Sequence, residues 1–147
     1  MNKENEKKEQ LDLISKHQES KEWLSEIQTW QDGIQFMKSK ILRFSPHIND
    51  ENRKLELRTF YLDLDGSLRG RIDWLTTKIE KHELEFKSYF ENNLQRSIPL
   101  LQKEYDVCKG EMKDLRLKYE LLRTDFYELV KPSLKVLKKE GKVEMAS

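Results

Sequence analysis

Residues 101–136, LQKEYDVCKGEMKDLRLKYELLRTDFYELVKPSLKV, decide the fold. Apolar side chains recur there at steps that alternate between four and three residues: Leu101, Tyr105, Cys108, Met112, Leu115, Tyr119, Leu122, Phe126 and Leu129. A mean spacing of about 3.5 residues is the period of a helix that packs along a coiled-coil seam, whereas a strand would repeat every two residues. Such a stripe cannot face water alone, so we expect the rest of the chain to cover it.

A matching stripe occupies the first third of the chain. Its members are Leu13, His17, Ser20, Trp23, Ile27, Trp30, Ile34, Met37, Ile41 and Phe44. From Trp23 onward the steps again alternate four and three, which predicts a helix over residues 9–44. We expect residues 1–8, which are mostly charged, to fray. Gly33 interrupts this helix at a cost of up to ~1 kcal/mol relative to alanine.

The middle of the chain is expected to form a helix over residues 49–93. Its second half carries a regular stripe: Leu68, Ile72, Leu75, Ile79, His82, Phe86 and Tyr89. Residues 55–66 are ambiguous, because alternating leucines and an Asp-Gly pair are also typical of a hairpin. We favour a helix, since a lone hairpin would lack partner strands. In that helix Tyr61 lies on the core face, Phe60 lies outside it, and an irregular step at Leu68 unwinds the supercoil locally.

Turn signals separate the three helices. Pro46 lies in the first connection, and Ser97 is expected to cap the third helix. Pro132 is expected to end or kink that helix, with Gly141 as a cap for any continuation. The predicted helices and the kinked or loose tail span residues 9–44, 49–93, 98–131 and 132–147. Short connections make neighbours antiparallel, so we predict one all-α domain, an elongated antiparallel three-helix bundle with coiled-coil-like packing that dimerisation would complete.

The helix lengths also predict a register. Counting from the turns places Trp30 level with Asp65 and Gly66, and these level with Phe126. Glycine would leave room for the indole there, and the indole N–H would donate to Asp65.

Composition limits the classes of function. The 147 residues include 28 Lys plus Arg and 27 Asp plus Glu, so the net charge of +1 gives no general reason to bind nucleic acid. The first ten residues lack the apolar core of a signal peptide, and no run approaches the ~18 apolar residues of a membrane span. One cysteine makes no intrachain disulfide. We expect a cytoplasmic protein with no membrane span.

Known signatures of catalysis and metal binding are missing from the sequence. It contains no Walker loop, no Gly-x-Gly-x-x-Gly, no Cys-x-x-Cys and no Gly-x-Ser-x-Gly. No Asp or Glu is followed three residues later by His, as a di-metal bundle site requires. His82 and Cys108 lie on core stripes and are interpreted as structural. We therefore predict no catalytic residue, no metal ligand and no cofactor, and we favour a protein that is not an enzyme.

The positive signal is surplus apolar surface on the middle helix. Phe60, Arg71 and Trp74 fall off the main stripe, and aromatic residues and arginine are enriched at interface centres. A helix from a second copy or from a partner would cover them, unless the tail after Pro132 does so. The first hypothesis is a non-enzymatic helical interaction, adaptor or assembly protein that acts through this face, with a protein partner or self-association.

Two other functions stay open. One is a bundle that holds a metal or small ligand in its core, with an enzyme among the options, using His82, Asp65 and the tyrosines of the core stripes. The other is a nucleic-acid or membrane-surface binder acting through the Lys-rich tail, for which lysines that offset a helix dipole are the simpler explanation. The stripe period resembles that of spectrin-like and other three-helix bundles, which implies an architecture and no function.

Overall fold

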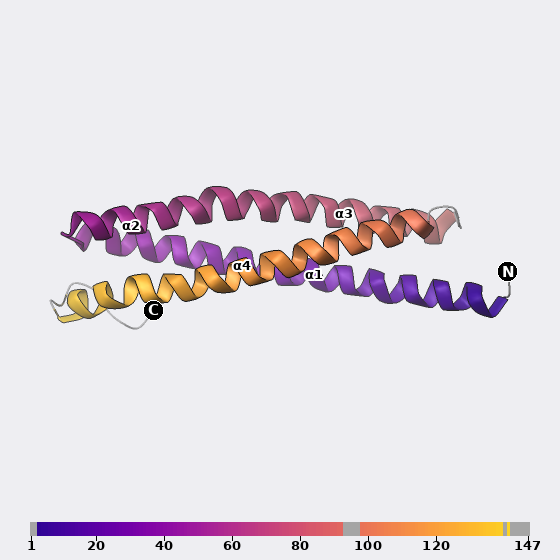
Figure 1. The fold of residues 1–147 in the computed structure, drawn as a ribbon, viewed down its shortest axis with the longest axis horizontal. Coiled ribbons are helices and arrows are strands. Elements are labelled where there is room, and N and C mark those ends of the chain that lie inside the picture. Colours follow the sequence, from indigo (N-terminus) through magenta and orange to yellow (C-terminus); the bar gives the residue numbers. More distant parts are fainter. Residues whose placement is uncertain (1–2, 93–97, 140, 142–147) are drawn as a thin grey trace. The chain divides into compact units, whose positions relative to one another are not determined.

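The structure, a computed structural model, describes residues 3–92, 98–139 and 141. It is all-α, and the described residues form no strand (Figure 1). Residues 55–66 are therefore helical, and the hairpin alternative is excluded. In order along the chain, the elements are α1 (Lys3–Phe44), a 3-10 turn η1 (Ser45–His47), α2 (Glu51–Leu62), a π-helical turn η2 (Asp63–Leu68), α3 (Arg69–Asn92) and α4 (Ile98–Lys139). Among the described helices, none combines the length and apolar character needed to cross a membrane.

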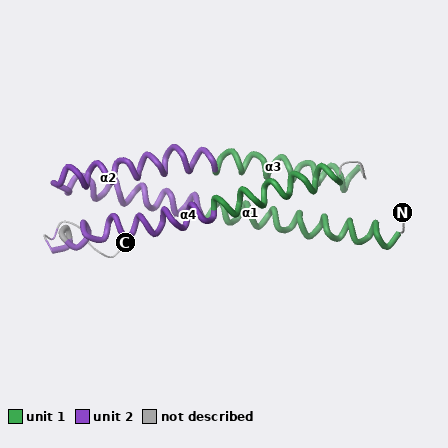
Figure 2. Tube along the Cα trace, in the orientation of Figure 1, with its two compact units in different colours: residues 1–29, 72–115 green, residues 30–71, 116–147 purple. Residues whose placement is uncertain are grey.

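The chain packs as two compact units, which Figure 2 shows in different colours. Unit 1 comprises residues 1–29 and 72–115, and unit 2 comprises residues 30–71 and 116–147. Each unit takes one segment of α1, one segment of the α2–η2–α3 run and one segment of α4. Each unit is therefore a helical bundle with its own core, and the predicted helical bundle is confirmed.

The core of unit 1 contains the stripe residues that the sequence predicts for α3. From α1 it buries Leu13, Ser20, Trp23 and Ile27. From α3 it buries Ile72, Leu75, Ile79, His82, Phe86 and Tyr89. From α4 it buries Leu101, Tyr105, Cys108, Met112 and Leu115. The His17 ring lies 5.1 Å from the Phe86 ring, and Ser20 donates a hydrogen bond to Glu83. The residue number rises from His17 to Ser20 in α1 while it falls from Phe86 to Glu83 in α3, so these two helices are antiparallel.

The core of unit 2 is formed in the same way. Its larger buried side chains are Trp30, Ile34, Met37, Ile41, Phe44, Leu57, Phe60, Leu64, Leu68, Tyr119, Phe126 and Val130. Arg53 donates to Ser133 Oγ over 3.3 Å, and the Phe60 ring lies 6.2 Å from that of Phe126. These contacts make α2 and α4 antiparallel. Asp50 caps α2 by accepting from the backbone N–H of Asn52 at 2.9 Å.

The prediction for Phe60 and Tyr61 is wrong. Phe60 is buried on the core face, whereas Tyr61 is only half-buried. The buried positions Phe60, Leu64, Leu68 and Ile72 are each four residues apart, which is longer than the α-helical repeat. The π-helical turn η2 bonds i to i+5 and so takes up the extra length. The irregular step predicted at Leu68 therefore has a structural counterpart, a π-helical turn.

The predicted register of Trp30 is also wrong. Trp30 stacks on Tyr119, with ring centroids 6.1 Å apart, while Asp65 accepts from Lys38 Nζ at 2.6 Å. Lys38 rather than Trp30 therefore meets Asp65, an offset of about two helical turns. The close approach occurs at Gly33, where a Cβ would overlap the Tyr119 hydroxyl.

The end of α4 follows one of the two alternatives that the sequence leaves open. The helix does not end at Lys131 but continues through Pro132 to Lys139, close to Gly141. Leu129 is only half-buried, and Val130 and Ser133 extend the core stripe beyond it. The missing proline N–H leaves one carbonyl without its helical donor, yet the helix continues to Lys139.

Helix ends elsewhere agree with their chemistry. Gly141 has φ +70°, and its N–H donates to the Lys138 carbonyl over 3.0 Å, which is the arrangement of a glycine after a helix C-terminus. Helix α1 begins at Lys3, so residues 3–8 are helical rather than frayed. The cap predicted at Ser97 lies outside the described residues.

Candidate functional site

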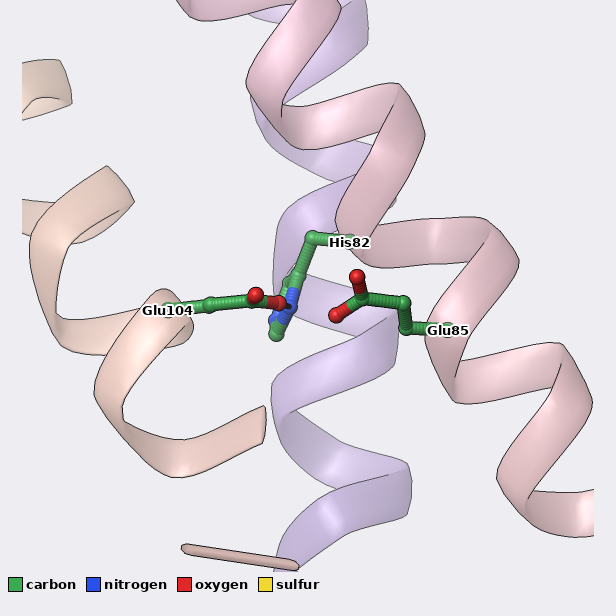
Figure 3. Close-up of side chains that lie close together, drawn as sticks. All are labelled: His82, Glu85 and Glu104. Atoms are coloured by element: carbon green, nitrogen blue, oxygen red, sulfur yellow. Dashed lines mark hydrogen bonds and ion pairs between the residues drawn. The ribbon is translucent and has the colours of Figure 1, made fainter. Parts of the chain in front are cut away.

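Unit 1 carries a polar layer at the edge of its core, formed by the buried His82 and the half-buried Glu85 from α3 and by the half-buried Glu104 from α4 (Figure 3). Residues three apart on a helix share a face, so His82 places Glu85 beside it. Glu104 precedes the stripe residue Tyr105 and reaches His82, with 3.2 Å between His82 Nδ1 and Glu104 Oε2. One donor atom from each of the three side chains lies within 4.8 Å of the other two.

Burial and like charge set the electrostatics of this layer. The pKa of His82, which is 1% exposed, is lowered by burial, against the opposing charges of Glu83 and Glu85, and this favours a neutral imidazole. The hydrogen bond to Glu104, reinforced by burial, raises the pKa of Glu85 to about 7. In the absence of a bound cation, the two carboxyl groups therefore share a proton near neutral pH.

The layer holds more acceptors than donors. His82 Nε2 and Glu85 Oε2 are both buried and have no hydrogen-bond partner among the described residues. Figure 3 shows the three side chains converging, with the imidazole ring beside the Glu104 carboxylate. A buried polar atom without a partner lowers stability by roughly 1–3 kcal/mol, so this arrangement is not explained by packing alone.

A second polar group lies beside the layer, where α1 crosses α3. His17 Nδ1 lies 3.0 Å from Glu83 Oε2, although the two are not aligned as a hydrogen bond, and Ser20 donates to the other oxygen of Glu83. On the α4 side, Tyr105 donates to Glu19. Burial and this bond raise the pKa of Tyr105 well above its usual value, so it stays a neutral donor. Glu83 and Tyr105 are therefore engaged within the bundle, whereas the buried His17 Nδ1 has no hydrogen-bond partner among the described residues.

Unit 2 carries a groove between α2 and α4, which we call the Phe60 groove. Its volume is about 410 Å³. Its floor and walls are Leu55, Thr59, Phe60 and Leu129, and its rim is Glu56, Asp63 and Asp125. The three rim carboxylates are exposed and have no ion-pair partner among the described residues. The groove is therefore apolar inside and acidic at its edge.

The three residues predicted to bind a partner lie in different surroundings. Phe60 forms part of the groove floor and is 8% exposed. Arg71 is half-buried and interacts with other side chains. Trp74, in unit 1, is 48% exposed and has the Lys78 ammonium 4.5 Å from its ring centre. Phe60 and Arg71 belong to unit 2 and Trp74 to unit 1, and their role in binding a partner stays a prediction.

Sequence reasoning missed the cluster of His82, Glu85 and Glu104. A search for Glu-x-x-His does not find His82-x-x-Glu85, which has the reverse order and the same shared face. Glu104 comes close only through the register of α3 against α4, for which the sequence carries no direct signal. Asp65, considered with His82 as a core ligand, instead pairs with Lys38 in unit 2. Cys108 is buried, and burial raises its thiol pKa to about 11, which favours the protonated thiol over the thiolate.

Comparison with known proteins gives no family for this chain: neither a protein-family model, nor a curated protein, nor a solved structure matches it. The function must therefore be argued from the two features above, the acceptor-rich layer of unit 1 and the Phe60 groove of unit 2.

Proposed function

We propose that the protein is a non-enzymatic helical interaction protein, and that the Phe60 groove binds a basic amphipathic helix of a protein partner. The observation that carries this proposal is the combination of an apolar floor with an unpaired acidic rim. An amphipathic helix binds such a groove by placing side chains at i, i+3 or i+4, and i+7 into it.

The apolar part of the groove has the composition of an interface centre. Phe60 packs on Phe126 at its base, so its ring is already fixed by the core. Leu55, 63% exposed, supplies the apolar surface that a partner side chain would cover. Fixed aromatic floors flanked by exposed apolar walls are typical of binding hot spots.

Charge selects the partner. Glu56, Asp63 and Asp125 are among the residues that line the groove, and none of its lining residues is basic. Acidic rims attract segments rich in Lys or Arg and repel acidic ones. A helix whose apolar stripe is flanked by lysines therefore fits the groove better than an acidic or neutral one.

Binding of two designed peptides tests the proposal. One peptide is an amphipathic helix with leucines at helical spacing and flanking lysines, and the other replaces every lysine with glutamate. We expect the basic peptide to bind and the acidic peptide not to bind, as followed by fluorescence anisotropy at two salt concentrations. Equal binding of both peptides, or of neither, contradicts the proposal.

Two leucine variants localise the binding. Leu55→Ser removes a groove wall and should weaken binding of the basic peptide about tenfold, the value of one buried leucine contact. Leu84→Ser is the matched control, since Leu84 is an equally exposed leucine (67%) on α3 of unit 1. Loss of affinity in the control but not in Leu55→Ser would place the interaction elsewhere. Sedimentation of both variants at rising concentration shows whether a second copy of this chain is the occupant.

A further inference from the structure

We propose that His82, Glu85 and Glu104 bind one divalent transition-metal ion in unit 1, and that Zn²⁺ fits their donor set. This site is separate from the Phe60 groove, and of its three residues the sequence considers only His82 as a core ligand, together with Asp65 rather than Glu85 or Glu104. The proposal rests on the identity, spacing and burial of the three side chains and on the polar atoms that lack partners.

The donor set suits a metal of intermediate softness. One imidazole nitrogen and two carboxylate oxygens are common ligands of Zn²⁺, whereas Mg²⁺ and Ca²⁺ prefer oxygen alone. Three protein ligands leave one coordination position for water, as in zinc sites that exchange a ligand. The geometry therefore points to Zn²⁺ rather than to an alkaline-earth ion.

The spacing is close to what a metal needs. The donor atoms lie within 4.8 Å of one another, whereas two ligands of a tetrahedral Zn²⁺ are about 3.4 Å apart. The side chains need to close by no more than about 1.4 Å. Glu85 and Glu104 are only half-buried, so their side chains have room to rotate and the ion has a path from solvent.

The partnerless atoms point to a ligand independently of the spacing. The His82 ring is almost completely buried beside the Glu104 carboxylate (Figure 3), and its Nε2 has no hydrogen-bond partner among the described residues. Glu85 Oε2 is in the same condition. If Nδ1 carries the imidazole proton and donates to Glu104, Nε2 presents a free lone pair, and a cation is a ligand that satisfies this nitrogen and a carboxylate oxygen at once.

The neighbouring pair of His17 and Glu83 is the main competitor for the ion. Glu83 already accepts from Ser20, and His17 packs against Phe86. His17 Nδ1 lies 3.0 Å from Glu83 Oε2 and has no hydrogen-bond partner among the described residues, so this pair offers a nitrogen and an oxygen of its own. A variant of Glu83 therefore distinguishes the proposed site from its neighbour.

Zinc binding to the full chain tests the proposal. The protein is stripped with a chelator, and Zn²⁺ alone is titrated in competition with a chromogenic indicator. We expect one equivalent to bind, and the melting temperature to rise when it does. Glu85→Gln and Glu104→Gln keep the side-chain shape and should each weaken Zn²⁺ binding at least about tenfold. The carboxylate variants are preferred to a His82 variant, which alters a fully buried ring, and circular dichroism confirms that they fold.

Matched controls make the result decisive. Glu80→Gln changes an exposed glutamate on the same helix, and His47→Asn removes an exposed histidine of the α1–α2 connection. Both should bind Zn²⁺ as the unmodified chain does, and so should Glu83→Gln. The proposal is overturned if the unmodified chain shows no saturable binding below about 100 µM Zn²⁺. It is equally overturned if folded Glu85→Gln and Glu104→Gln bind as tightly as the controls, or if Glu83→Gln alone loses binding.

Discussion

Each unit places charged side chains near its apolar core, but unit 2 pairs opposite charges there, whereas unit 1 brings two carboxyl groups together. In unit 2, Lys38 reaches Asp65 at 2.6 Å, and Arg69 approaches the same oxygen at 3.3 Å, so opposite charges meet. In unit 1, Glu85 and Glu104 meet each other and a neutral histidine. The first arrangement is complete as it stands, whereas the second needs a proton or a cation. A polar group near a core therefore points to a ligand when some of its atoms lack a hydrogen-bond or ion-pair partner, and not merely because it is polar.

Removal of the aromatic support under the unit 1 layer should have the largest effect. Phe86 is fully buried, with its ring 4.5 Å from that of His82 and 5.1 Å from that of His17. Phe86→Ala should lower the free energy of unfolding by about 3–5 kcal/mol, because it leaves a cavity and frees both rings. Denaturant titration measures the change. A loss below about 1 kcal/mol would mean that the layer does not depend on this packing.

The matching experiment in unit 2 adds an atom instead of removing several. A Cβ at Gly33 would overlap the Tyr119 hydroxyl and lie 3.0 Å from Cζ of that ring. Gly33→Ala should destabilise the protein by about 1–3 kcal/mol despite the better helix propensity of alanine. In the Tyr119→Phe background the hydroxyl is gone, so the same substitution should cost clearly less in a double-mutant cycle. Equal losses in both backgrounds would contradict the contact.

The extent to which the sequence predicts these features depends on the kind of contact. The stripe from Ile72 to Tyr89 is buried at every predicted position, because periodicity alone determines which face of a regular helix is apolar. Phe60 rather than Tyr61 is buried because the π-helical turn shifts the repeat of the core positions. No residue type in the sequence predicts such a turn. The contact of Gly33 with Tyr119 and the contact of Glu104 with His82 depend on the register between helices. The spacing of residues within one helix does not predict that register.

The pH dependence of stability should have a characteristic sign in unit 1. The pKa of Glu85 is raised from the usual 4.5 to about 7, so the folded chain binds more protons than the unfolded chain between these values. The free energy of unfolding should therefore fall as pH rises from about 4.5 to 7, with a chelator present to exclude metals. Glu85→Gln should remove this part of the slope. An unchanged slope in that variant would mean that the carboxyl groups do not share a proton.

The smallest effect is expected at the Lys38–Asp65 pair, and its sign is opposite. The hydrogen bond to Lys38 lowers the pKa of Asp65 below its usual 3.8, so its contribution is present above that pH and is lost as pH falls further. Lys38→Met keeps the aliphatic packing and leaves Arg69 beside Asp65, so at pH 7 the melting temperature should change by no more than about 4 °C. The difference between the unmodified and Lys38→Met chains should shrink in acid, whereas the difference for Glu85→Gln should grow toward neutral pH. If the stability differences of the two variants from the unmodified chain changed with pH in the same direction, the distinction between a paired charge in unit 2 and an acceptor-rich layer in unit 1 would be contradicted.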